Sequence, residues 1–480
     1  MLSRALQHLR RHVVVYVVLF VALSGTSYAA TAKLVRKNSV GSAQVINGSL
    51  LKVDLNKKAT AALRGAPGLQ GPLGAAGEAG AAGPLGPKGD SGGPGAPGQQ
   101  GAQGPQGLPG SARLRSGPGA AGLATLHGGP DLVGIYTSAT IGADALGLIS
   151  YYDGTNGSLR VGHCNNTACT SAGTSPLDSD PAIILGWYTS LTIGADGLGL
   201  ISYYDVTNGD LKVAHCNNVA CTSASKSVVD AGPPGNVGSY TSATIGADGL
   251  GLISYYDVTN QDLKVAHCDN TACTTAIKST LDSTGDVGWY TSATTGADGL
   301  GLISYYDNSN HDLRVAHCDN VACTTASTST RDSIGDVGSY TSATTGADGF
   351  GLISYYDTTN GDLKAAHCSA PECTSASTSM LDGLADVGTY SSVTIGGDGL
   401  GLISYYDTTN SDLKIAHCDN VSCTSASPST LDSTGIVGWY TSVTIGTDGF
   451  GLISYYDATN GDLKAAHCAS SACAPHFRRR

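Results

Sequence analysis

The sequence has few large apolar residues for its length. Its 480 residues include four phenylalanines, three tryptophans and two methionines, against 66 glycines. A single large hydrophobic core needs many more such side chains. The composition therefore predicts several small cores rather than one.

Basic residues are scarce in most of the chain. Residues 131–480 contain 13 Lys and Arg against 35 Asp and Glu, a net charge of −22, whereas residues 1–130 contain 13 against 3, a net charge of +10. Phosphate contacts need Lys and Arg, so the acidic part is not expected to bind nucleic acid. The basic part is suited to an anionic surface.

Helix-length apolar periodicity is absent from residues 131–480. Instead one stretch, GLGLISYYDVTNGDLKVAHC at 197–216, occurs seven times with few changes. The tyrosine that opens each unit recurs after 52, 52 and then four times 50 residues, which is a period typical of propeller blades. These tyrosines are Tyr136, Tyr188, Tyr240, Tyr290, Tyr340, Tyr390 and Tyr440.

Each unit consists of four short runs with strand-like composition, separated by Asp-Gly or Asn-Gly turns that suit tight hairpins. We therefore expect an all-β fold, a seven-bladed β-propeller of four-stranded blades over residues 124–477. The last unit lacks its fourth run, and Ala124–Tyr136 aligns with Ser279–Tyr290. A strand from the start of the domain is thus expected to complete the last blade, which closes the ring and removes open edges.

All fourteen cysteines lie in the repeats, two per unit at one fixed spacing. Such a pattern indicates seven disulfides in an exported protein. Metal binding is the rival, but the adjacent His and Cys of each unit point to opposite faces of a strand and chelate poorly. The predicted pairs are Cys164 with Cys169, Cys216 with Cys221, Cys268 with Cys273, Cys318 with Cys323, Cys368 with Cys373, Cys418 with Cys423, and Cys468 with Cys473.

The N-terminal residues 1–29 have the features of a secretory signal peptide: early arginines, the apolar run Val13–Leu23 and small residues before the cleavage site. An uncleaved membrane anchor is the alternative, although eleven apolar residues are short for a span. Residues 30–64 form a basic spacer, and residues 478–480 a basic tail whose role the sequence does not show. The protein is therefore expected to be secreted or held at the cell surface.

Glycine occupies every third position from Gly65 to Gly110. Only glycine fits the crowded axis of three wound polyproline II chains, so residues 65–112 are expected to form a collagen-like triple helix, followed by a linker at 113–123. The segment resembles bacterial collagen-like proteins, and Pro87–Asp90 (PKGD) resembles the KGD element of that family. The resemblance implies a homotrimer.

The ISYYDxTNxDLK pattern resembles repeats of bacterial extracellular proteins with sialidase-like propellers. A sialidase needs a cluster of three arginines, but the repeats offer only Arg160, Arg314 and Arg331, which are not expected to converge. The Tyr-Tyr-Asp run and the histidine before each first cysteine are expected to be structural. Those histidines are His163, His215, His267, His317, His367, His417 and His467.

The differences between units are scattered, whereas an active site needs them on one face of the ring. The sequence analysis therefore predicts that the protein is not an enzyme. The differences on which this argument rests are Gly154, Ser158, Gly162, Arg331 and Pro371.

One end of the propeller is expected to be ringed with carboxylates. In a four-stranded blade the loop between strands two and three shares a face with the connection to the next blade, and both carry Asp. These carboxylates could hold Ca²⁺, could attract a cationic partner or could simply maintain solubility; Asp and Asn also stabilise turns through their own backbone. No other cofactor is expected. The residues of this candidate ligand face are Asp153, Asp205, Asp210, Asp257, Asp262, Asp307, Asp312, Asp357, Asp362, Asp407, Asp412, Asp457 and Asp462.

The sequence thus predicts an extracellular, non-catalytic protein for binding, adhesion or structure, in which collagen-like stalks display three propeller heads. Three weak heads on one stalk bind better than one when geometry permits. The expected ligand is a glycan, a protein or a cationic partner. The alternative function is a carbohydrate-active hydrolase or lyase on a sialidase-like propeller.

Overall fold

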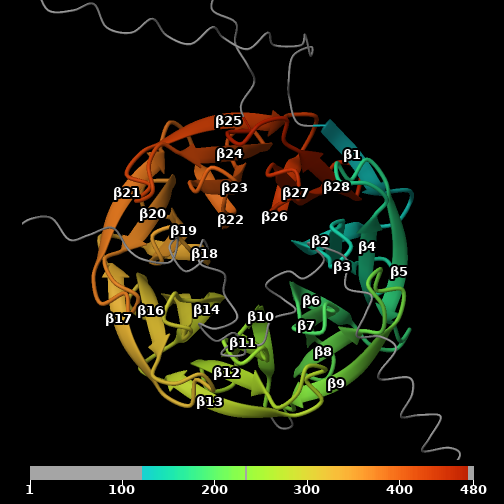
Figure 1. Ribbon diagram of the computed structural model, residues 1–480, viewed down its shortest axis with the longest axis horizontal. Coiled ribbons are helices and arrows are strands. Elements are labelled where there is room, and N and C mark those ends of the chain that lie inside the picture. Colours follow the sequence, from blue (N-terminus) through green and yellow to red (C-terminus); the bar gives the residue numbers. More distant parts are fainter. Residues whose placement is uncertain (1–121, 233–234, 474–480) are drawn as a thin grey trace, which may run out of the picture. The chain divides into compact units, whose positions relative to one another are not determined.

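The structure is a computed structural model that describes residues 122–232 and 235–473. The predicted signal peptide, basic spacer, collagen-like segment and basic tail, and most of the predicted linker, lie outside the described residues. The described residues form seven four-stranded antiparallel sheets arranged in a ring (Figure 1). The predicted all-β, seven-bladed propeller is confirmed.

The blades share one strand plan from the axis outward. The innermost strands are β2 (Val133–Ile141), β6 (Leu185–Ile193), β10 (Val237–Ile245), β14 (Val287–Thr295), β18 (Val337–Thr345), β22 (Val387–Ile395) and β26 (Val437–Ile445). The second strands are β3 (Gly147–Asp153), β7 (Gly199–Asp205), β11 (Gly251–Asp257), β15 (Gly301–Asp307), β19 (Gly351–Asp357), β23 (Gly401–Asp407) and β27 (Gly451–Asp457).

The third strands are β4 (Ser158–Cys164), β8 (Asp210–Cys216), β12 (Asp262–Cys268), β16 (Asp312–Cys318), β20 (Asp362–Cys368), β24 (Asp412–Cys418) and β28 (Asp462–His467). The outermost strands are β5 (Ala172–Asp178), β9 (Ala224–Asp230), β13 (Ala276–Asp282), β17 (Ala326–Asp332), β21 (Ala376–Asp382), β25 (Ala426–Asp432) and β1 (Gly122–His127). Blades are numbered here 1 to 7 in the order of their innermost strands.

The ring is closed by β1, which pairs antiparallel with β28 and completes blade 7. Gly122 lies opposite His467, and His127 lies opposite Leu463. In Figure 1, β1 lies beside the last strands of the chain although more than 300 residues separate them. The closure inferred from the alignment of the N-terminal segment is therefore present.

The cores lie between neighbouring blades. Six of the GLISYYD strands are buried along their whole length, because each is covered by a blade on both sides, whereas Tyr356 of β19 is half-buried. One core, for example, combines Leu148 and Leu159 of blade 1 with Ile201 and Tyr203 of blade 2. This arrangement explains how a chain with so few large apolar residues stays folded.

Buried hydroxyl pairs join each blade to the preceding one. Thr189 Oγ1 donates to Ser150 Oγ at 2.6 Å. The pair that joins blade 1 to blade 7 is Thr137 with Ser454, at 2.7 Å. The ring closure therefore has the same hydroxyl pair as the other junctions.

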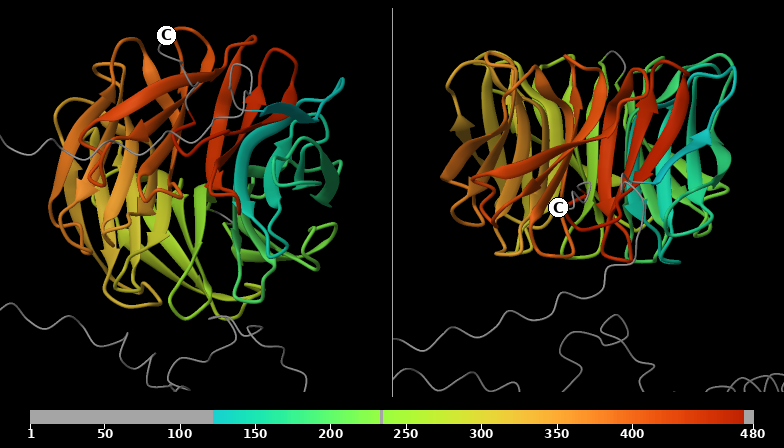
Figure 2. Two further views of the ribbon diagram at one scale, coloured as in Figure 1. Left: turned by 45° about the horizontal axis from the view of Figure 1, so that its top comes forward. Right: turned by 90° about the horizontal axis from the view of Figure 1, so that it is seen from above.

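The loops gather at two opposite ends of the ring (Figure 2). The front face, as we name it, carries the loops between second and third strands together with the connections between blades. These elements are hydrogen bonded to one another, as in Val237 N to Gly209 O at 2.9 Å. The back face carries the turns between first and second strands and the loops between third and fourth strands.

Candidate functional site

The predicted ligand-face carboxylates fall into two sets, of which the first ends each second strand and is buried. Asp205, for example, is 2% exposed. Its carboxylate accepts hydrogen bonds from the backbone N–H and the side-chain amide of Asn208, at 3.0 and 2.9 Å. This set therefore stabilises the turns. Its members are Asp153, Asp205, Asp257, Asp307, Asp357, Asp407 and Asp457.

The second set opens the third strands. Asp262 lies opposite Asp257 in the strand register. Burial raises the pKa of Asp262, and the charge of Asp257 adds to this effect. Among the described residues no three His, Cys, Asp or Glu side chains are grouped to hold a metal ion, so calcium binding stays a prediction. The members of this set are Asp210, Asp262, Asp312, Asp362, Asp412 and Asp462.

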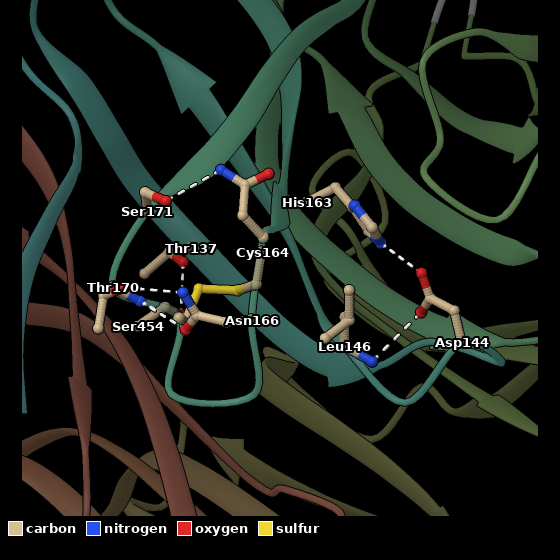
Figure 3. The surroundings of a disulfide bond; sticks show 11 residues. Thr137, Asp144, Leu146, His163, Cys164, Asn166, Thr170, Ser171 and Ser454 are labelled. Atoms are coloured by element: carbon tan, nitrogen blue, oxygen red, sulfur yellow. Dashed lines mark hydrogen bonds and ion pairs between the residues drawn. A yellow bond between two sulfur atoms is a disulfide. The ribbon is translucent and has the colours of Figure 1, made fainter.

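The back face carries the disulfides and the histidines. All fourteen cysteines are paired as predicted, so the disulfide bonding is confirmed. Figure 3 shows the first pair, beside which His163 Nε2 lies 2.8 Å from Asp144 Oδ2. The other Asp144 oxygen accepts from the backbone N–H of Leu146 at 3.2 Å. The other histidines lie 2.8 to 2.9 Å from the aspartates of their own first turns. At His267 and His467 this contact lacks the geometry of a hydrogen bond.

The tyrosines that open the units form a closed ring around the axis. Neighbouring ring centroids lie 4.5 to 4.7 Å apart all the way round. Their φ angles lie between 52° and 55°, in a region that costs about 1 kcal/mol or more for a non-glycine residue. A register shift between Trp187 and Ser190 shows the cause in blade 2, because such a bulge re-aims a side chain.

The tyrosine ring and the hydroxyl residues that follow it line a central cavity of about 210 Å³. Burial raises the pKa of Tyr136 well above its usual value, and the neighbouring tyrosines add to the effect. The phenol groups that line the central cavity therefore stay neutral.

The residue before each ring tyrosine differs between blades and shapes the front face. Where it is tryptophan, the indole covers tyrosines of the preceding blade. Trp289 lies 5.7 Å from Tyr240 and 5.6 Å from Tyr256, measured between ring centroids. Trp187 and Trp439 make the same kind of contacts in blades 2 and 7. The smaller residues at this position are Ile135, Ser239, Ser339 and Thr389.

Blades 5 and 6 are neighbours that both lack this tryptophan. Ser339 and Thr389 take its place, and a cavity of about 340 Å³ opens there on the front face. We call this cavity the aromatic pocket. It is lined by Trp289, Tyr290, Tyr306, Asn308, Asp336, Ser339, Tyr340, Tyr356, Thr358 and Thr389.

Two polar residues are found only in blade 4: Asn308 lines this pocket, and His311 contacts Tyr306, which lines it. Tyr306 donates to Asp336 Oδ1 at 2.9 Å, and His311 Nδ1 lies 2.7 Å from the same phenol oxygen. Asn308 donates to Asp286 Oδ2 at 2.7 Å. Burial raises the pKa of Tyr306, and the Asp336 carboxylate reinforces this shift. Neither His311 nor Asn308 has a counterpart of its type at the equivalent position of another blade.

The sequence analysis missed this site, although a signal existed. It weighed scattered differences such as Gly154 and Pro371 and concluded that no sector of the ring was special. The residue before the unit-opening tyrosine, compared across the seven units, marks blades 5 and 6 as adjacent units without tryptophan. Ser339 and Thr389 therefore place two of these differences side by side on one face of the ring.

Comparison with protein families gives one match, to the collagen triple helix repeat over residues 61–129. The chain carries a collagen-like segment. The match is wider than the predicted 65–112, and its end overlaps β1 of the propeller. No curated protein matches the chain. Among the described residues no helix is long and apolar enough to cross a membrane.

Solved structures share the propeller at low identity. A protein of unknown function from Dyadobacter fermentans DSM 18053 has a TM-score of 0.46 and 11% identity, covering 72% of this chain and 98% of its own. An alpha-L-arabinofuranosidase from Fusarium graminearum has 0.44 and 11%, covering 59% and 92%. An exo-beta-1,3-galactanase from Phanerochaete chrysosporium has 0.37 and 9%, covering 71% and 78%. These likenesses show the fold alone.

The prediction that the protein is not an enzyme is wrong as an exclusion. The solved structures that resemble this chain at low identity include two that are named as glycoside hydrolases. The scatter of the differences also does not exclude a site, because Asn308, Ser339 and Thr389, which differ from the tryptophan blades or from every other blade, meet at the aromatic pocket.

Proposed function

We propose that the protein is an extracellular binding protein whose collagen-like segment joins three propeller heads, each of which takes a ligand in the aromatic pocket. The observation that carries this proposal is the pocket itself. Five aromatic rings and a few polar groups line it, which is the composition of small-ligand sites. It occurs where Ser339 and Thr389 replace a tryptophan that fills the same position in three other blades.

The surrounding features support the extracellular and trimeric parts of the proposal. Seven disulfides in one domain fit an oxidising compartment. A collagen triple helix needs three chains. One modest pocket per head then becomes a trivalent binder, whose avidity exceeds the affinity of a single head.

A substitution that the fold already accepts tests the pocket. Ser339→Trp restores the residue found in blades 2, 4 and 7, so the head is expected to fold and the pocket to be filled. Ser239→Trp is the matched control, because it makes the same change on the same face in blade 3. Binding of the labelled protein to a glycan array and a peptide array is expected to be lost in the first variant only. Equal binding by both variants would remove the pocket from the proposal.

Trimerisation is tested separately by light scattering of the mature protein, with and without residues 65–110. We expect the mass of three chains to fall to that of one on deletion. A monomer in both forms would refute the collagen-stalk part of the proposal and leave a single head.

Glycoside hydrolysis is the second candidate function. It is favoured by one observation, the hydrogen-bonded series His311, Tyr306 and Asp336 at the pocket, because such groups can move a proton. Incubation with 4-nitrophenyl glycosides tests it. Turnover that Ser339→Trp abolishes and Ser239→Trp leaves intact would assign catalysis to this pocket.

A further inference from the structure

We infer that the aromatic pocket takes an organic ammonium group, either a quaternary ammonium or the side chain of a lysine. This inference rests on the proposed binding function and names the ligand chemistry of the same pocket. It stands on the rings, the charge of the lining and the distribution of carboxylates on the front face.

The aromatic rings form two layers. Tyr290 and Tyr340 are neighbours in the central ring, with centroids 4.5 Å apart. Tyr306 and Tyr356 each lie 6.4 Å from one of them, at centroid distance, further from the axis. Trp289 completes the lining. Electron-rich ring faces attract a cation, and tryptophan and tyrosine do so best.

The charge of the lining has one sign. Asp336 is its one charged residue, and no Lys or Arg belongs to it. Arg314 lies 2.7 Å from Asp282 and Lys364 hydrogen bonds to Asp332, so these two cations are already paired. The lining therefore offers a charged partner to a cation, at Asp336, and none to an anion.

One position on the front face carries a carboxylate in this sector alone. The residue before the innermost strand is Asp286, Asp336 or Asp386 in blades 4, 5 and 6. The other blades have Leu132, Ile184, Asn236 and Ile436 at this position. The acidic sector coincides with the aromatic pocket, so the local potential favours a positive ligand.

Asp336 has more capacity for a ligand than its neighbour. The Asp286 carboxylate accepts three hydrogen bonds, from Tyr256, Trp289 and Asn308. Asp336 accepts one from the described residues, at Oδ1 from Tyr306, and its side chain is 34% exposed. The Oδ2 oxygen lies 3.9 Å from His311 Nδ1, which is beyond hydrogen-bond distance, so it remains for a cation that enters the pocket.

A matched pair of ligands isolates the charge. Choline and 3,3-dimethyl-1-butanol have the same shape, but only choline is positive. Calorimetric titration of the full-length protein at pH 7.5 is expected to show choline binding about tenfold more tightly. n-Butylammonium, which has a primary amine, separates the two sources. Tighter binding of choline indicates a quaternary headgroup, and tighter binding of n-butylammonium indicates a lysine side chain.

Two variants test the role of Asp336 in choline binding. Asp336→Asn is expected to weaken choline binding about tenfold. Asp131→Asn is its control, because it makes the same charge change in blade 1 of the front face, and it is expected to change binding less than about twofold at physiological salt. Ser339→Trp is expected to abolish binding that Ser239→Trp retains.

The inference fails if neither ammonium compound binds, if the alcohol binds as well as choline, or if Asp336→Asn has no effect. Such a result leaves the proposed function standing when a neutral glycan or peptide on the arrays still binds in a manner that Ser339→Trp abolishes. Loss of the pocket dependence on the arrays refutes the proposed site itself.

Discussion

The junction where the ring closes lacks a carboxylate that the other junctions have. In blade 2, Tyr203 and Lys212 both donate to Asp178, which ends the outermost strand of blade 1, at 2.6 Å. At the closing junction that position is His127, whose Nδ1 lies 2.9 Å from Tyr151 Oη. We predict that His127→Asp stabilises the propeller by installing the missing carboxylate.

The gain follows from two interactions. A charge-assisted hydrogen bond is roughly twice as strong as a neutral one, so Tyr151 contributes about 1 kcal/mol. Arg160 is 18% exposed, and its nearest carboxylate is Asp153 at 3.5 Å. If the new carboxylate at position 127 pairs with Arg160 as Asp282 pairs with Arg314, this ion pair adds about 1 kcal/mol to the stability. For a domain of this size, with an unfolding entropy of about 0.7 kcal/mol/K, a total of about 2 kcal/mol raises Tm by about 3 °C.

The pH dependence provides a second measurement. Burial lowers the pKa of His127, and the Arg160 guanidinium lowers it further. The unfolded chain therefore binds this proton more readily, so the wild type has its full stability above pH 6.5 and loses part of it as pH falls below 6.5. His127→Asp removes this loss, and its advantage over the wild type should grow between pH 8 and pH 5.

Urea unfolding across that pH range measures both effects. Asp178→His makes the reverse change at the next junction and is expected to cost roughly 3 kcal/mol, because it leaves Lys212 without its closest partner. The reasoning is refuted if His127→Asp is less stable than the wild type, or if its advantage does not change with pH.

Other perturbations test the repeated contacts. Replacing both Cys318 and Cys323 by serine should lower the free energy of unfolding by about 2 kcal/mol, because the closed loop is short, with reduction of the wild type as the comparison. Ser254→Ala should cost about 1–2 kcal/mol in urea unfolding, since it leaves the buried Thr291 hydroxyl without its partner, and no loss would contradict the role of these pairs. Burial opposes ionisation of Asp332, but hydrogen bonds from Lys364 and Tyr355 outweigh it and hold its pKa below the usual value. The stabilising contribution of ionised Asp332 should therefore be complete above pH 3.8 and should be lost as the pH falls through the lowered pKa. Asp332→Asn should weaken this dependence of stability on pH.

Repetition explains why the fold could be predicted. The period of the tyrosines gave the blade number, and the alignment of the segment before Tyr136 gave the closing strand. The cysteine spacing gave the disulfides, because an identical pair in every unit has its nearest partner in the same unit. Each of these inferences needs only the backbone pattern that the repeated units share.

The site could not be predicted from one unit. The aromatic pocket joins Ser339 and Thr389, which lie 50 residues apart and meet because their blades are adjacent. The left-handed backbone of Tyr136 depends on a register shift between two strands, for which the chain has no local mark. For Asp205 the sequence left several roles open, and stabilising its turn was one of them. The residue pattern does not distinguish a carboxylate that is hydrogen bonded within its turn from one that is free to bind a ligand.

Because the blades are nearly identical, comparing equivalent positions distinguishes residues that maintain the fold from residues that serve another purpose. Where Arg314 stands in place of Lys264, the same carboxylate position still receives the charge, so the contact survives the change. Where Ser339 stands in place of a tryptophan, no other side chain fills the space, and the rings of Tyr290 and Tyr306 lose a cover. An aromatic contact of this kind contributes about 1 kcal/mol, and two neighbouring blades forgo it. An aromatic surface beside Asp336 that no side chain covers destabilises the free propeller head, and a bound ligand can cover it. This is the physical reason to expect the ligand there.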